Sequence, residues 1–150
     1  MTIRHILLLT DLSPESLRPA APVTELATKL GARVTLMTVV QDVRIAPHGA
    51  PLAPKISAPD VDREVKHAKL ALDEQRATLS GITVETAVIR GDAVPESVVD
   101  YAEQHDVDLI ALSTHGRTGF RHLALGSVAE SIIRHATVPV VTFPRVTKKH

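Results

Sequence analysis

Cysteine is absent from the chain, and so is tryptophan. Without cysteine the chain can form neither a disulfide scaffold nor a zinc site built from thiolates. Aromatic residues make up 2% of the sequence and comprise Tyr101, Phe120 and Phe143. So few rings argue against the stacking platforms on which single-strand nucleic-acid binders hold bases.

An excess of charge is also missing, as is any long apolar run. The 17 Lys and Arg residues balance 17 Asp and Glu residues, so no general basic field attracts nucleic acid or anionic lipid. The apolar runs reach only about six residues, whereas a bilayer span needs roughly 20. The first residues show no cleavage site of a signal peptide. The 150 residues are enough for one core. We therefore expect a single domain, 1–150, in the cytoplasm, without nucleic-acid or membrane partners.

Apolar segments of two periodicities alternate along the chain. Short runs rich in β-branched residues are typical of buried strands. Between them lie segments in which apolar residues recur at helical spacing. Strict alternation of strands and helical crossovers predicts an α/β fold, a parallel sheet with helices on both faces. The expected strands are 3–10, 33–40, 82–89, 107–112 and 138–143, and the expected helices are 14–30, 60–80, 94–105 and 128–136.

Proline interrupts this order in two places. Pro19 and Pro22 predict a late or kinked start of the first helix, and Gly31 predicts its end. The segment 41–60 holds four of the ten prolines, which excludes a regular helix or a central strand there. A loop of this length is usually functional, so we expect 41–60 to be a mobile flap beside a ligand.

Ligands of parallel sheets bind beyond the carboxyl ends of the strands, where the strand order reverses. With the first strand central, that point lies between the first and fourth strands. Asp11 leaves the first strand there, which favours a ligand contact over a helix-start role. Gly116 and Gly119 permit close backbone approach, and Gly126-Ser127 precede the free amides of the last helix, which can receive phosphate. Each feature alone fits ordinary turn chemistry, but together they predict an anion site.

Two well-known nucleotide motifs are absent, the P-loop and the Gly-x-Gly-x-x-Gly fingerprint. Instead, Gly116, nine residues and Gly126-Ser127 resemble the signature Gly-x2-Gly-x9-Gly-Ser/Thr of the universal stress protein family (UspA-like). Ser113 replaces the first glycine of that pattern. Further matches to the family are Asp11-Leu12-Ser13, Gly31-Ala32, Gly91-Asp92, 102–110 and Val138-Pro139-Val140-Val141.

The resemblance implies a Rossmann-like sheet of five parallel strands in the order 3-2-1-4-5. It also implies ATP as the ligand, with Mg²⁺ bridging the phosphates. Asp11 and Val39 would then contact the adenosine, and Ser113 would either crowd the ribose or bond to it. Apart from the resemblance, four residues around the glycine loop would offset phosphate charge, unless they are solvated loop residues: His115, Arg117, Arg121 and His122. The candidate binding residues are Asp11, Val39, Ser113, His115, Gly116, Arg117, Gly119, Gly126, Ser127 and Val128.

The function implied is that of an ATP-binding stress-response protein in which the nucleotide signals a conformational or dimer state. One alternative is an interaction module that has lost nucleotide binding, and another is a slow ATP hydrolase or adenylyl-transferring enzyme. No nucleophile, catalytic base or metal-ligand spacing identifies itself. The apolar run 138–143 would form an edge strand, so we expect a homodimer that pairs through it.

Overall fold

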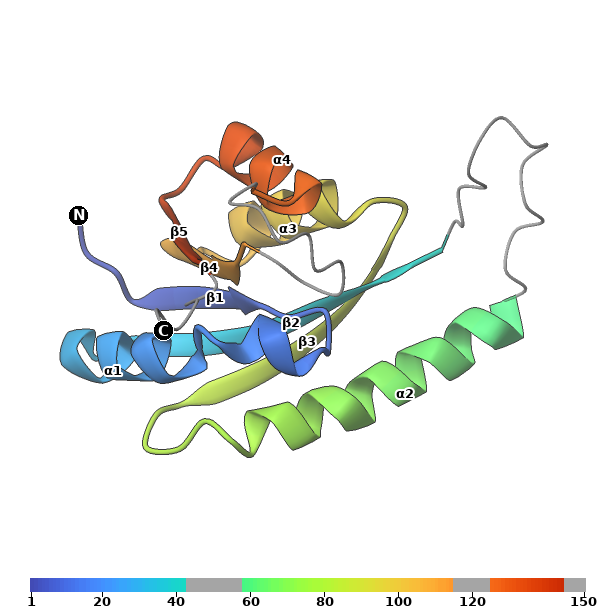
Figure 1. The fold of residues 1–150 in the computed structure, drawn as a ribbon, viewed down its shortest axis with the longest axis horizontal. Coiled ribbons are helices and arrows are strands. Elements are labelled where there is room, and N and C mark those ends of the chain that lie inside the picture. Colours follow the sequence, from blue (N-terminus) through green and yellow to red (C-terminus); the bar gives the residue numbers. More distant parts are fainter. Residues whose placement is uncertain (43–57, 115–124, 145–150) are drawn as a thin grey trace, which may run out of the picture.

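A computed structural model describes residues 1–42, 58–114 and 125–144. Five parallel strands form one sheet in the order β3-β2-β1-β4-β5, which confirms the predicted fold class (Figure 1). The predicted flap falls mostly within 43–57, outside the described residues. The strands are β1 (His5–Leu9), β2 (Arg33–Gln41), β3 (Val84–Gly91), β4 (Leu109–Ser113) and β5 (Val140–Phe143).

Helices cover both faces of this sheet. In Figure 1, α1 and α2 lie on one face, while α3 and α4 lie together on the other. None of the helices within the described residues is long and apolar enough to cross a bilayer. The helical elements are the 3-10 helix η1 (Pro14–Leu17) and the α-helices α1 (Ala20–Leu30), α2 (Ala58–Arg76), α3 (Val94–Gln104) and α4 (Ser127–His135).

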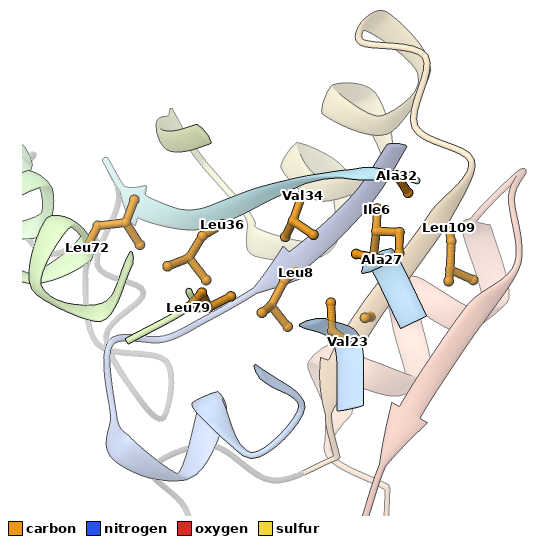
Figure 2. Close-up of a cluster of buried hydrophobic side chains, with 11 residues drawn as sticks. Ile6, Leu8, Val23, Ala27, Ala32, Val34, Leu36, Leu72, Leu79 and Leu109 are labelled. Atoms are coloured by element: carbon orange, nitrogen blue, oxygen red, sulfur yellow. The ribbon is translucent and has the colours of Figure 1, made fainter. Parts of the chain in front are cut away.

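Strand β1 is buried along its whole length, which explains the unbroken apolar run Ile6 to Leu9 within it. Ile6 and Leu8 point toward α1 and α2, where they pack with Val34, Leu36 and Leu72 (Figure 2). The alternate residues Leu7 and Leu9 pack on the opposite face with side chains of α3 and α4. The strand thus holds two core layers together and fixes the position of whatever follows it.

The late start predicted for the first helix is confirmed. Ser13 caps the short helix η1, because its hydroxyl accepts a hydrogen bond from the Ser16 amide. The α-helix itself begins only at Ala20, after Pro19, and ends at Gly31 with φ +65°. Leu12 has φ +69°, a left-handed conformation that leucine rarely adopts. The sequence analysis did not foresee this sharp turn after β1.

Several predicted boundaries were wrong by a few residues. Helix α2 begins at Ala58, not at residue 60, because proline is tolerated in the first turn, where its missing N–H has no intrahelical partner. Strand β3 extends to Gly91, which pairs with Gln41, two residues beyond the predicted end at residue 89. Strand β5 begins at Val140, not at 138, because Pro139 has no N–H for the ladder.

Strand β4 begins two residues later than predicted. The amide of Val107 donates to the Ala102 carbonyl at 3.0 Å, so this residue still belongs to the end of α3. Asp106 between them has φ +51°. Local hydrogen bonds at the helix end therefore decided a boundary that apolar periodicity placed too early.

Candidate functional site

A cavity of about 250 Å³ lies beyond the carboxyl ends of β1, β2 and β4, where the strand order reverses. It brings together all six candidate residues that the structure describes: Asp11, Val39, Ser113, Gly126, Ser127 and Val128. The other four candidates, His115, Gly116, Arg117 and Gly119, lie outside the described residues. The remaining described lining consists of Leu9, Thr10, Ser16, Thr38, Val94, Leu112, Thr114 and Ala129.

The N-terminus of α4 forms one wall of the cavity. The first intrahelical bond runs from the Glu130 amide to the Gly126 carbonyl at 2.9 Å. The amides of Ser127, Val128 and Ala129 therefore have no acceptor within the helix. The N-terminal end of the helix also carries a partial positive charge. This wall can accept an anion.

Gly126 brings the chain backbone close to this wall. Its amide donates to the Thr114 carbonyl at 3.2 Å, and a Cβ at this position would lie 3.0 Å from the same oxygen. Gly126 occupies the N-cap position without a side-chain cap. Ser127 is therefore the first helical residue, and its side chain is exposed.

The carboxylate of Asp11 is held in a tight turn after β1. Its Oδ1 accepts hydrogen bonds from the Ser13 amide, at 2.9 Å, and from the Ser13 hydroxyl. Leu12 at the centre of the turn has the left-handed φ noted above. The turn fixes the direction of Asp11 at the mouth of the cavity, where the side chain is exposed.

Two buried threonines lie side by side in the cavity lining. Because Leu9 pairs with Met37, the next residues along the strands, Thr10 and Thr38, are neighbours on the face of α2. The Thr10 hydroxyl contacts the Ser16 hydroxyl and the Gln75 amide, both at 2.8 Å. The Thr38 side chain is 3% exposed and lines the cavity, and no residue in the described part of the chain hydrogen-bonds its hydroxyl.

The sequence analysis missed both of these threonines as site residues, together with Ser16. A signal was present, since a hydroxyl residue that interrupts an apolar strand must find a partner or a ligand when buried. The apolar part of the lining is supplied by Leu9, Val94 and Leu112 beside Val39. The cavity therefore combines an apolar wall for a flat ring with polar groups for hydroxyls and an anion.

A second polar cluster, at the opposite end of the sheet, surrounds His5. The imidazole is 3% exposed; its Nδ1 lies 3.0 Å from the His105 carbonyl and its Nε2 lies 2.7 Å from the Thr35 hydroxyl. Burial lowers the pKa of His5, and the nearby Arg33 guanidinium acts in the same direction. Desolvation also raises the pKa of the Tyr101 hydroxyl.

The carboxylate of Asp108 also belongs to this second cluster. It accepts the backbone amides of Arg4, at 2.8 Å, and of His5, at 3.0 Å. The bond from the Arg4 amide is the main reason that the pKa of Asp108 lies below its usual range. The polar groups at the amino end of the sheet therefore bind one another.

Residues 2–144 match the model of the universal stress protein family. The chain belongs to this family. It is 29% identical over 153 residues to universal stress protein MJ0531 of Methanocaldococcus jannaschii, covering 97% of this chain and 85% of that protein. Universal stress protein Slr1230 of Synechocystis is 33% identical over 76 residues, and there the match spans 51% of this chain and only 26% of the relative.

Solved structures of universal stress proteins share the fold. The protein UspA of Lactobacillus plantarum superposes with a TM-score of 0.74 at 26% identity, over 95% of this chain and 98% of that one. Two more distant structures share the fold at TM-scores of 0.62 and 0.60, with 20% and 18% identity. The first is a universal stress protein in complex with cAMP, over 96% and 98% of the two chains, and the second is the Archaeoglobus fulgidus protein in complex with dAMP, over 95% and 98%.

Proposed function

We propose that this universal stress protein binds an adenine nucleotide, namely ATP, in the cavity at the carboxyl end of the sheet. The observation that carries the proposal is the convergence of Asp11, Val39, Ser113 and the 126–128 segment on one cavity. These residues were selected from the sequence and come from β1, β2, β4 and the start of α4. The complexes of related proteins with cAMP and dAMP add support for adenine nucleotides.

The parts of the nucleotide match different walls of the cavity. The apolar wall around Val39 suits the base, Asp11 and Ser113 suit the ribose, and the α4 amides suit the phosphates. Attraction to a helix terminus is worth only about 0.3–2 kcal/mol, whereas micromolar affinity needs about 8 kcal/mol. Several amide bonds and the Asp11 contact must therefore act together. Mg²⁺ would be brought by the nucleotide, not held by a cage of protein side chains, and would offset phosphate charge beside the α4 amides.

A signalling role fits this lining better than turnover does. Asp11 is the one acidic or basic side chain among the described residues that line the cavity. General acid-base chemistry uses a positioned proton donor or acceptor next to a nucleophile, and the described lining offers no such pair. We infer that bound nucleotide changes the conformational or assembly state of the protein.

The direct test is to denature the purified protein and identify released nucleotide by mass. Calorimetry with ATP on the parent and on Ser113→Gly then separates two readings of Ser113. Tighter binding by the variant means that the serine crowds the ribose, and equal binding means that it is accommodated. If neither folded protein binds ATP, the proposed function is wrong. The chain is then better explained as an interaction module of the same fold that does not bind nucleotide.

A second copy of the chain is the partner that we propose for the β5 edge. Within the described residues β5 pairs only with β4, and Val141 of this edge strand is 38% exposed. Ile133 of α4 is exposed as well. An apolar edge strand favours pairing with another strand, and an isologous pair would cover both copies. Light scattering tests this, since a mass of one chain at every concentration would exclude the dimer.

A further inference from the structure

A chain of hydrogen bonds connects α2 with the turn that carries Asp11. Gln75, 65 positions after Thr10, reaches across to the end of β1, and its amide lies 2.8 Å from the Thr10 hydroxyl. Thr10 in turn lies 2.8 Å from the Ser16 hydroxyl, which lies 2.7 Å from the Ser13 carbonyl. Gln75, Thr10, Ser16 and Ser13 form what we call the Gln75 relay.

Two backbone amides of the turn also donate hydrogen bonds to the hydroxyls of this relay. The Leu12 amide donates to the Thr10 hydroxyl at 3.0 Å, and the Asp11 amide donates to the Ser16 hydroxyl at 3.3 Å. These bonds hold the backbone in the left-handed conformation at Leu12. The direction in which the Asp11 carboxylate leaves the turn therefore depends on both hydroxyls.

The protons available to the hydroxyls fix the direction of the relay. The Ser13 carbonyl only accepts, and it accepts the Ser16 amide at 3.2 Å as well as the Ser16 hydroxyl at 2.7 Å, so the hydroxyl contact uses the one proton of the Ser16 hydroxyl. Ser16 must then accept from Thr10, which uses the one proton of the Thr10 hydroxyl. Thr10 has nothing left to donate toward Gln75, so the bond between them requires a donor on Gln75.

The amide group of Gln75 can supply that donor. The atom nearest to Thr10 is Oε1, and a half-turn of the amide places Nε2 at the same position. With the nitrogen there, each hydroxyl donates once and accepts twice, which satisfies every group of the relay. With the oxygen there, two acceptors compete for one proton.

We propose that Gln75 is a positioning residue for Asp11 that acts as the terminal donor of the relay. The inference rests on the proposed function, because it assigns Asp11 to the nucleotide. Gln75 itself does not line the cavity. Its donated proton sets the order Gln75 to Thr10 to Ser16 to the Ser13 carbonyl, in which each hydroxyl also accepts one backbone amide of the Asp11 turn.

Gln75→Glu tests the direction of the relay while keeping the shape of the side chain. At pH 7.5 the carboxylate can only accept, so we expect ATP affinity, measured by calorimetry, to fall about fivefold to tenfold, the effect of roughly one lost hydrogen bond. Near pH 4, below the ordinary glutamate pKa of about 4.3, most of the carboxyl groups carry a proton and become donors. The affinity relative to the parent protein at the same pH should then recover.

Two further variants separate positioning from general damage. Gln75→Met removes the donor without adding a competing acceptor, so its loss of affinity should be smaller and should not vary with pH relative to the parent. Gln104→Glu makes the same chemical change at an exposed position of α3, and it should bind like the parent. Thermal unfolding of all variants shows whether each is folded.

Amide hydrogen exchange keeps this test independent of nucleotide binding. Exchange at Leu12 and Asp11 should speed up severalfold in Gln75→Glu at pH 7.5 and remain unchanged in Gln104→Glu. Failure of the parent to bind ATP would end the proposed function, while faster exchange would still support the relay. A Gln75→Glu variant with the affinity and exchange of the parent at pH 7.5 would overturn the donor assignment.

Discussion

The surroundings of the buried polar groups differ between the two ends of the central strand β1. At the amino end the ring nitrogens of His5 contact the His105 carbonyl and the Thr35 hydroxyl. At the carboxyl end the Thr38 hydroxyl and the first amides of α4 face a cavity. Buried polar groups normally find partners. The polar groups at the amino end therefore bind one another, whereas the described residues leave the Thr38 hydroxyl and the first amides of α4 to the nucleotide that we propose.

The largest expected effect at the ligand end is that of Gly126→Val. A Cβ there would already lie 3.0 Å from the Thr114 carbonyl, and the branched side chain would push ligand phosphates away from the α4 amides. We expect calorimetry to detect no ATP binding, while circular dichroism shows a folded protein. Binding within twofold of the parent would place the phosphates elsewhere.

At the amino end acid should cost stability rather than binding. The folded protein lowers the pKa of His5, so the neutral ring stabilises the fold fully above the unfolded pKa, near 6.5. That contribution is lost as pH falls below this value toward the folded pKa. The Arg33 guanidinium, 3.2 Å from Nδ1, adds repulsion once the ring is charged.

Urea unfolding between pH 7.5 and 5 measures this loss. His5→Leu is the matched variant: it should be less stable at pH 7.5 by about 2 kcal/mol, since the Thr35 hydroxyl and the His105 carbonyl lose a partner. Its stability should also fall less steeply with acid. A parent and a variant with the same pH dependence would show that His5 does not cause the loss of stability in this pH range.

The fold was predictable because burial leaves a direct trace in the sequence. The run 6–9 is apolar without alternation since β1 is covered on both faces. Strand ends were less accurate because single hydrogen bonds, such as that of the Val107 amide to Ala102, decide them. Such bonds depend on the neighbouring helix end and not on local composition.

The candidate site was predictable only where position along a strand or helix was enough. Asp11 and Gly126 could be placed because one ends a strand and the other begins a helix. Thr10, Thr38 and Gln75 could not, because their neighbours come from the register of β1 with β2 and from the crossing of α2. The sequence marks a buried hydroxyl, but not whether the fold satisfies it.

Thr38→Val tests this distinction directly. Valine has the shape of threonine but lacks the hydroxyl, and the described residues offer that hydroxyl no partner, so thermal stability should not fall. ATP affinity should fall about fivefold to tenfold if the hydroxyl bonds the ligand.

Thr10→Val should instead lower stability, because three groups lose a partner. Thr86→Val, at an exposed site on β3, should change neither property, and equal destabilisation by Thr38→Val and Thr10→Val would remove the contrast.

The smallest expected effect belongs to Ser127→Ala. Its hydroxyl lies at the first position of α4 on the cavity wall and is exposed, so water replaces part of what the hydroxyl gives a phosphate. We expect a loss of about 1 kcal/mol, or roughly threefold to fivefold in ATP affinity. Adenosine, which has no phosphate, should bind the parent and the variant equally. An equal loss for adenosine and ATP would mean that Ser127 contacts the nucleoside, and the phosphates would then have to be reassigned away from the α4 terminus.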